Sequence, residues 1–336
     1  MKILIVGCGS IGKRHMGTLQ QIGGHELIAY RTHREDSQKL EAHYGVRIFY
    51  SMEEALAQKP EAAIIANPTS LHVAAARQAL AAGCHLFMEK PISHTLEGVE
   101  ELLQQAEKQK RVVFIGYQWR FNPLLIRAKE QIDAGAMGKI LFVRTQIGQY
   151  LPDWHPWEDY RKGYYGREDL GGGALLTLSH NLDYLLWFLG KPAQVSCFMD
   201  KVSELEIDTE DMAELILRFP SGALGSVHMD YLQRTTTHTC QIIGEEGEMV
   251  IDLQQGTART FLADMGQWHE DRLPKGFARD DMFLAELKHF LDCINNGVPC
   301  RMDGRRVGRL ALEVICAAQE SAGTGKVISL DERITV

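Results

Sequence analysis

The stretch Gly7-Cys8-Gly9-Ser10-Ile11-Gly12 decides the fold. It matches the pattern G-x-G-x-x-G and follows a short apolar run at residues 2–6. It also opens a helical pattern of apolar residues, namely Ile11, Met16, Leu19 and Ile22. A strand, a glycine turn and a helix in this order are typical of a dinucleotide-binding Rossmann domain. The pattern therefore predicts an α/β fold that starts with the first residues of the chain.

Each glycine of the turn has a physical purpose. Gly7 permits the tight turn, Gly9 lets a pyrophosphate approach the backbone, and Gly12 lets the helix pack closely on the strand. The helix start, at Ser10 and Ile11, offers free amides and positive potential to a phosphate. We predict that these residues bind a dinucleotide; the alternative is a glycine turn without a ligand.

The first 121 residues alternate strands with helices. Short apolar or β-branched runs lie at residues 2–6, 26–30, 46–50, 62–66, 85–88 and 112–116. Such runs are typical of strands buried on both faces, and the alternation with helices implies right-handed crossovers. We therefore predict a parallel, doubly wound sheet in a Rossmann domain over residues 1–121.

The rhythm changes after Asn122 and Pro123. Helices are expected at 124–134, 173–189, 282–295 and 306–322, and strands at 140–149, 194–199, 212–219, 223–231, 238–243 and 249–253. Successive strands with short turns indicate an open, mostly antiparallel sheet. Residues 122–336 are thus predicted to form a second, α+β domain.

Composition narrows the choice of partners. The 336 residues are 45% hydrophobic and 24% charged, which is the balance of a folded globular protein. The net charge of -8 argues against nucleic acid and anionic membranes. Because no apolar run could span a bilayer and no secretory signal is visible, we expect a cytoplasmic protein. The seven cysteines form no C-x-x-C pair, so no metal site is expected.

The end of the second predicted strand bears on the choice of cofactor. An acidic residue about 20 positions after the turn usually binds the ribose 2′-hydroxyl of NAD. Here Arg31 stands about where that carboxylate belongs, and the next acid is Glu35. Arg31 and Arg34 are suited to pair with a 2′-phosphate, so we favour NADP over NAD. Alternatively, both arginines are solvated charges beside an unselective adenosine pocket.

Two further segments follow strands at the edge where such a sheet binds its ligand. Asn67-Pro68, with His72 close behind, ends the fourth strand, and Glu89-Lys90-Pro91 ends the fifth. The later motifs are Arg120-Phe121-Asn122-Pro123, Gly171-Gly172-Gly173 ahead of His180 and Asp183, and Ser321-Ala322-Gly323-Thr324-Gly325. With the glycine turn, these make essentially the whole chain resemble the glucose–fructose oxidoreductase, inositol dehydrogenase and rhizopine catabolism family (Gfo/Idh/MocA).

The resemblance implies a two-domain NAD(P)-dependent dehydrogenase that acts on a sugar, cyclitol or nucleotide sugar. Its second domain would bind substrate and form homo-oligomers through the open sheet. The family's catalytic lysine maps onto Lys90 and its helix histidine onto His180, and the proline after the lysine, here Pro91, is commonly cis. We place Asn67, Pro68, His72, Glu89 and Lys90 at the cofactor.

Lys90 and His180 suit the proton exchange that a nicotinamide-dependent reaction requires. The cofactor carries out the hydride transfer, so the protein must position the substrate and exchange a proton with its hydroxyl or carbonyl. A lysine in a cleft beside an oxidised nicotinamide should have a lowered pKa and serve as acid or base near neutral pH. His180 would share that proton or orient the substrate oxygen. The alternatives are a surface salt bridge for Lys90 and a core histidine for His180.

One position departs from the family pattern. Many members carry an aspartate four residues before the histidine, where this chain has Leu176; three residues before it stands Thr177. Neither side chain is a base. Asp183, three residues after His180, shares a face of the predicted helix with it and is placed to orient the imidazole. We therefore count Asp183 among the catalytic candidates.

The loop over residues 150–167 combines aromatic and cationic side chains, among them Trp154 and Tyr165. Such groups suit a polyhydroxylated ligand, and they equally suit a contact between subunits. Gln118 and Arg120 lie just beyond the sixth predicted strand, near the expected nicotinamide end. We predict that these four residues bind substrate together with Lys90 and His180.

Three functions compete. The leading one is a dehydrogenase or reductase of a sugar-like substrate. The second is a lyase, epimerase or hydrolase that uses the nicotinamide transiently, which a net change in nicotinamide absorbance would distinguish from the first. The third is a non-catalytic NAD(P)-binding sensor, against which the presence of both Lys90 and His180 argues.

Overall fold

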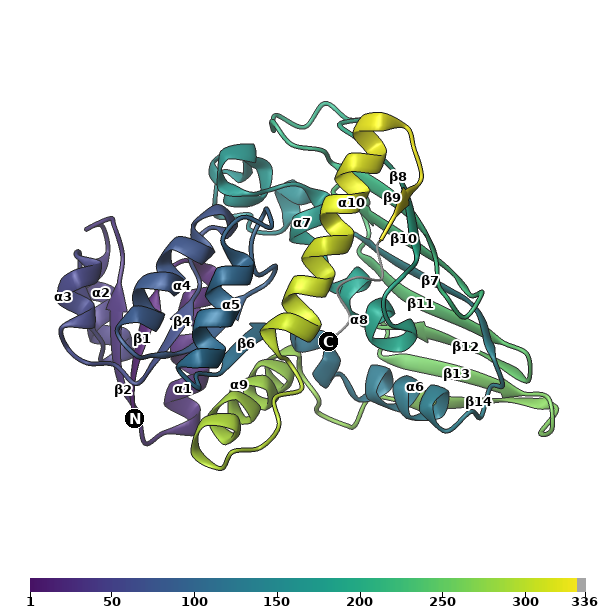
Figure 1. Ribbon diagram of the computed structural model, residues 1–336, viewed down its shortest axis with the longest axis horizontal. Helices are drawn as coiled ribbons and strands as arrows, with labels where there is room; N and C mark the ends of the chain where they lie inside the picture. The colour runs from purple at the N-terminus through teal and green to yellow at the C-terminus, as the bar shows by residue number, and fades with distance from the viewer. Residues whose placement is uncertain (331–336) are drawn as a thin grey trace. The chain divides into compact units, whose positions relative to one another are not determined.

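The computed structural model describes residues 1–330, which form two compact units (Figure 1). The first comprises residues 1–118 and 278–312, and the second comprises residues 119–277 and 313–330. The predicted boundary after residue 121 lies three residues from the observed one. The sequence assigned residues 278–312 to the second domain, whereas they pack in the first unit. Residues 331–336 of the predicted second domain lie outside the described residues.

The first unit is built on a six-stranded sheet with the order β3-β2-β1-β4-β5-β6. Every pair of neighbours is parallel, so the predicted doubly wound sheet is confirmed. The apolar runs form strands with both faces buried, as β1 and β4 illustrate. The strands are β1 (Lys2–Val6), β2 (Glu26–Tyr30), β3 (Arg47–Phe49), β4 (Ala62–Ile65), β5 (His85–Glu89) and β6 (Val113–Gly116).

The helices of this unit are α1 (Ser10–Ile22), α2 (Ser37–Tyr44), α3 (Met52–Leu56), α4 (His72–Ala81), α5 (Val99–Lys108) and α9 (Arg279–Asn295). Helix α9 belongs here because it packs on α1 and buries Phe283 and Phe290. Arg14 of α1 also forms an ion pair with Asp280 of α9. The following segment contacts β6, where the Ile115 amide donates to the Met302 carbonyl at 2.9 Å.

The second unit contains a nine-stranded sheet with the order β14-β13-β12-β11-β7-β10-β9-β8-β15. Within this sheet, only the β7–β10 pair is parallel among the described strand pairs, so the expected open, mostly antiparallel sheet is confirmed. The strands are β7 (Ile140–Gly148), β8 (Gln194–Asp200), β9 (Met212–Arg218), β10 (Leu224–Asp230), β11 (Thr237–Gly244), β12 (Gly247–Asp252), β13 (Thr257–Leu262), β14 (Gln267–Arg272) and β15 (Ile328–Ser329). The sequence did not predict β13, β14 or β15; β14 is polar and exposed and has no apolar alternation.

The two faces of this sheet differ sharply. Ala213, Leu215 and Leu217 alternate along β9 on the buried face, which α8 covers by packing on β7 and β10 (Figure 1). On the other face, Phe198 of β8 is 79% exposed and Ile216 of β9 is 47% exposed.

The remaining α-helices are α6 (Pro123–Asp133), α7 (Ala174–Thr177), α8 (His180–Leu189) and α10 (Leu310–Thr324), with a π-helical turn over Gly304–Arg309. The helix predicted over 173–189 is thus two helices, because the backbone leaves helical geometry at Leu178, whose φ is -96° and ψ is 15°. Across residues 1–330, no helix is long and apolar enough to cross a membrane.

Candidate active site

The glycine turn has the geometry that the sequence predicts. Gly7 has a φ of +98°, and a Cβ there would lie 2.7 Å from the Ala66 carbonyl oxygen. A Cβ on Gly12 would lie 2.1 Å from the Gly7 carbonyl oxygen, whereas a Cβ on Gly9 would meet nothing within 4 Å. Helix α1 starts at Ser10 with no side-chain cap and no acidic residue in its first turn. Its first amides therefore suit a phosphate, and Gly9 leaves room for it.

His72 contacts both of the loops that follow β4 and β5. The ring is buried, and its Nε2 and Nδ1 lie 2.9 Å from the carbonyl oxygens of Asn67 and Pro91, respectively. Burial lowers the pKa of His72, while the two carbonyl contacts oppose that effect. His72 therefore shapes the edge of the sheet through the backbone on either side of it.

Lys90 follows the last residue of β5 and is half-buried. Burial lowers the pKa of Lys90 to about 8; the neighbouring Glu89 carboxylate opposes this effect and the Arg279 guanidinium adds to it. The peptide bond between Lys90 and Pro91 is cis, as the resemblance implies. A lysine with this pKa can give or take a proton near neutral pH.

Glu89 points into the first unit. Its side chain is 10% exposed, and its Oε1 lies 2.6 Å from Nε2 of His15 on α1. Its Oε2 accepts a hydrogen bond from the backbone amide of Lys90 at 3.3 Å. The sequence placed Glu89 at the cofactor, and in the structure the Glu89 carboxylate contacts His15 and the Lys90 amide.

The arginines after β2 are accessible. Nη1 of Arg31 donates to the Glu35 carbonyl at 2.8 Å, which curls the side chain over this loop. The guanidinium carbon of Arg34 lies 4.3 Å from the centre of the Tyr50 ring. Both cations stand beyond the carboxyl end of β2, on the same edge of the sheet as the glycine turn.

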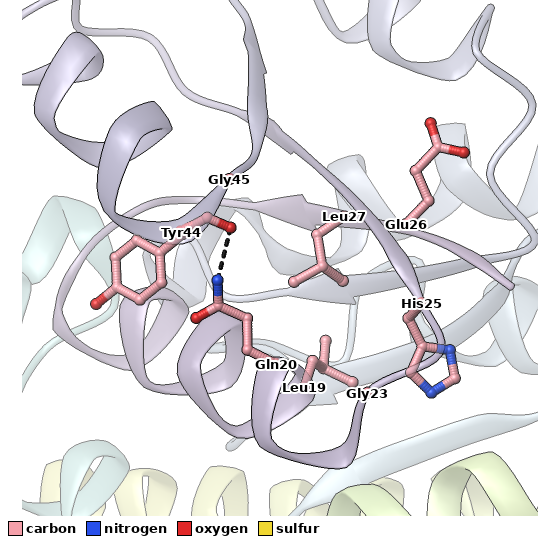
Figure 2. Close-up of a pocket in the computed structure, with 8 residues that line it drawn as sticks. All are labelled: Leu19, Gln20, Gly23, His25, Glu26, Leu27, Tyr44 and Gly45. Atoms are coloured by element: carbon pink, nitrogen blue, oxygen red, sulfur yellow. Dashed lines mark hydrogen bonds between the residues drawn. The ribbon is translucent and has the colours of Figure 1, made fainter.

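A hollow elsewhere in the first unit is lined by Leu19, Gln20, Gly23, His25, Glu26, Leu27, Tyr44 and Gly45 (Figure 2). Gln20 spans it and donates to the Tyr44 carbonyl at 2.7 Å. It lies at the carboxyl end of α1 and the amino end of β2, at the edge of the sheet opposite the glycine turn. We assign it no part in the candidate site.

In the second unit, His180 is the first residue of α8 and is 8% exposed. Asp183, one turn later, is held by Arg120. The Arg120 Nε and Nη2 atoms donate to the two carboxylate oxygens, each at 2.8 Å. Burial raises the pKa of Asp183, and Arg120 opposes that effect. The structure thus pairs two residues for which the sequence predicted separate roles.

The predicted aromatic residues form a cluster in the second unit. The Trp154 ring centre lies 5.6 Å from that of Tyr165 and 5.3 Å from that of Tyr231. Tyr165 is 5% exposed, and its carbonyl accepts from the Tyr231 hydroxyl at 3.1 Å. Trp119 packs against His238, with ring centres 4.3 Å apart. Gln118, the last residue of the first unit, is buried.

Sequence reasoning missed three ionisable groups with little or no exposure: His15 and Glu286 in the first unit, which are buried, and Glu210 in the second, which is partly buried. A signal existed for Glu286, which lies on the apolar face of α9 between Phe283 and Phe290. His15 similarly lies on the buried face of α1 with Met16 and Leu19. Glu210 carries no such signal, since it stands in an acidic loop.

Comparison with known proteins agrees with this architecture. Residues 1–117 match the model of an oxidoreductase family with an NAD-binding Rossmann fold, and residues 125–250 match the GFO/IDH/MocA C-terminal domain. The chain is 27% identical to myo-inositol 2-dehydrogenase of Thermotoga maritima, over 99% of this chain and 100% of that protein.

Two solved structures are similar over 98% of this chain. GenD2 from gentamicin A biosynthesis, in complex with NAD, has a TM-score of 0.85 at 25% identity, with 96% of its chain covered. The WlbA dehydrogenase of Bordetella pertussis, in complex with NADH and UDP-GlcNAcA, has a TM-score of 0.83 at 26% identity, with 99% covered. The glycine turn, the Lys90 edge and both matched domains place this chain in the GFO/IDH/MocA family of NAD(P)-dependent oxidoreductases.

Proposed function

We propose that the protein is a dehydrogenase or reductase of a sugar, cyclitol or nucleotide sugar, and that Lys90 exchanges the proton with the reacting oxygen. The observation that carries this proposal is the position of Lys90 directly after the carboxyl end of β5, where burial lowers the pKa of its amine to about 8. Strand β4 lies between β5 and the strand that leads into the glycine turn. Ligands bind at this edge of a doubly wound sheet.

The residues of this edge fit a nicotinamide dinucleotide. The uncapped start of α1 and the space at Gly9 suit its pyrophosphate, and Asn67 and Pro68 belong to the next loop along the edge. When bound, the cofactor supplies the hydride chemistry. The chain's own task is to hold the substrate and move the proton at the Lys90 Nζ atom.

We further propose that NADP is preferred over NAD. Arg31 and Arg34 provide two accessible cations where an NAD-selective site usually has a carboxylate. Arg31→Asp should shift the ratio of dissociation constants toward NAD, because the new charge repels a 2′-phosphate. Lys108→Asp makes the same change of charge on α5 and should leave the ratio unchanged. An unaltered ratio in Arg31→Asp would remove the argument for NADP.

In the second unit we propose that His180 contacts the substrate, and that the Arg120–Asp183 pair holds the start of α8 on which His180 stands. Trp154 and Tyr165 are proposed to bind the sugar, with Gln118. His180→Gln should lower kcat/KM for the substrate with little effect on cofactor binding. A variant with normal kcat/KM would leave His180 as a core histidine.

The test of Lys90 is a screen of sugars, cyclitols and nucleotide sugars with both cofactors, followed by nicotinamide absorbance. Lys90→Ala should reduce turnover by about 10²-fold or more on the identified substrate, with cofactor affinity nearly intact. Lys110→Ala, an exposed lysine in the same unit, is the matched control. Near-normal turnover of Lys90→Ala would end the assignment. Turnover without net change in absorbance would favour transient use of the nicotinamide.

We also propose that copies of the chain associate through the exposed face of the nine-stranded sheet. Phe198 and Ile216 present apolar surface there, which is uncommon for a sheet face that meets only water. Phe198→Glu should lower the molar mass in light scattering if this face is buried between copies. An unchanged molar mass would exclude association through this face.

The cytoplasmic location stays a prediction of the sequence.

A further inference from the structure

Three ionisable side chains are buried behind Lys90, and the proposed reaction uses none of them. They are His15 on α1, Glu89 on β5 and Glu286 on α9, with 0%, 7% and 0% of their surface exposed. All three belong to the first unit. Buried ionisable groups are costly unless they are paired, so a cluster of three calls for an explanation.

Glu89 is fixed at both carboxylate oxygens. Oε1 lies 2.6 Å from the His15 Nε2 atom, and Oε2 accepts the Lys90 amide at 3.3 Å. A Cβ on Gly116 of the neighbouring strand would lie 3.3 Å from Oε1, so the carboxylate rests over a residue with no side chain. The position of this charge relative to the Lys90 backbone is therefore set by packing.

Glu286 differs from Glu89 in its partners. Neither of its carboxyl oxygens has a hydrogen-bond partner among the described residues. Burial, and then the charge of Glu89, raise the pKa of Glu286 well above its usual range. Two carboxyl groups that share one buried site do not both ionise. Glu89 accepts from the Lys90 amide and lies against the His15 imidazole, whereas Glu286 has neither contact, so we assign the charge to Glu89 and the proton to Glu286.

We propose that His15 and the neutral acid of Glu286 confine a single negative charge to Glu89, and that this charge positions the Lys90 amine and stabilises its protonated form. Glu89 is then a positioning residue that acts through Lys90. The inference rests on the proposed function of Lys90 and adds the groups that support it.

Other charged groups face the same region, and each has a defined effect. Burial lowers the pKa of Lys90; the charge of Glu89 raises this pKa, and the charge of Arg279 on α9 lowers it further. Burial and then Arg14 lower the pKa of Arg279, which Asp280 and Glu89 raise. Burial lowers the pKa of His72 of α4, which Glu89 raises and Lys90 lowers. Because the charge of Glu89 raises the pKa of Lys90, removing that charge should lower it.

The experiment measures Lys90 itself. The full chain is labelled with acetic anhydride across a pH series, and the reactivity of Lys90 is read by peptide mass spectrometry. The wild type should show a midpoint near pH 8. Glu89→Gln removes the negative charge and should lower that midpoint by about one pH unit. Glu107→Gln, an exposed glutamate on α5, is the matched control and should leave it in place.

The His15 variants separate this role from general packing. His15→Phe removes the donor to Glu89 and should shift the midpoint in the same direction as Glu89→Gln. His15→Gln retains a donor and should restore most of the wild-type value. Equal midpoints in wild type, Glu89→Gln and His15→Phe would overturn the inference.

Glu286→Gln gives an independent reading if a Glu89 variant does not fold. The infrared spectrum of Glu286→Gln is subtracted from that of the wild type, and the difference should contain the C=O stretch of one protonated carboxylic acid. The midpoint of Lys90 labelling should be the same in Glu286→Gln as in the wild type. Absence of that band, or a midpoint lowered as in Glu89→Gln, would contradict the assignment of charge. Labelling needs no substrate, so its outcome is distinct from the turnover of Lys90→Ala that tests the proposed function.

Discussion

Glu210 should make the free energy of unfolding depend on pH. The Glu210 Oε1 atom accepts the Leu175 amide at 3.0 Å, at the start of α7. A Cβ on Gly173, whose φ is +104°, would lie 2.3 Å from the same oxygen, so the carboxyl group rests against a bare Cα. Burial raises the pKa of Glu210 from 4.5 to about 7, and the Leu175 hydrogen bond opposes part of that effect.

The sign of the effect follows from proton binding. Between pH 4.5 and about 7 the folded chain holds the Glu210 proton while the unfolded chain has released it. The free energy of unfolding therefore falls as the pH rises through this window. A shift of this size corresponds to about 3 kcal/mol, and partial exposure reduces our expectation to about 1–3 kcal/mol.

The assay compares urea unfolding of wild type and Glu210→Gln from below pH 4.5 to above pH 7. Glutamine retains the acceptor for the Leu175 amide and does not titrate. As the pH rises across the window, the free energy of unfolding of the variant should therefore increase by about 1–3 kcal/mol relative to that of the wild type. Glu204→Gln, an exposed glutamate in the same loop, should run parallel to the wild type. Parallel curves for Glu210→Gln would refute the reasoning.

Three further expectations concern other residues. Gly12→Ala should lower thermal stability because its Cβ meets the Gly7 carbonyl, whereas Gly9→Ala should keep the melting temperature and weaken cofactor binding in a fluorescence titration. Arg120→Met leaves the Asp183 carboxylate buried without its donor and should cost about 3–5 kcal/mol in denaturant unfolding; Asp183→Asn should cost less. His228, whose pKa is raised to about 9 by Asp230 and then Glu214, should stabilise the fold fully below pH 6.5 and lose that contribution as the pH rises through about 9. His228→Asn should therefore differ most from wild type below pH 6.5 and least above pH 9, and a constant difference would contradict this.

Local patterns were sufficient for the six-stranded sheet of the first unit. The glycine turn, the apolar strands and the alternating helices each involve neighbours in sequence, and the parallel sheet follows from them. The same edge of the sheet carries Lys90 because it directly follows a strand. The second sheet was predicted less completely, because β13 and β14 show little alternation of apolar and polar residues in sequence. Strand β14 lies exposed at the edge of the sheet and has no buried face to require such a pattern.

The partners of the candidate residues needed the tertiary structure. His15 and Glu89 are 74 residues apart, and Arg120 and Asp183 are 63 apart. No periodicity encodes such a pair, because contacts at this separation depend on how helices and strands pack. The placement of residues 278–312 in the first unit has the same cause.

The sequence alone determined that this chain has a dinucleotide-binding domain with a lysine at the end of its fifth strand, because a turn and a strand end are defined by adjacent residues. Only the tertiary structure decided that Glu89 turns inward to His15, that Asp183 pairs with Arg120, and that Glu286 lies buried on α9. Burial and charge at these positions arise from groups distant in the chain, and they come together only when the units are folded.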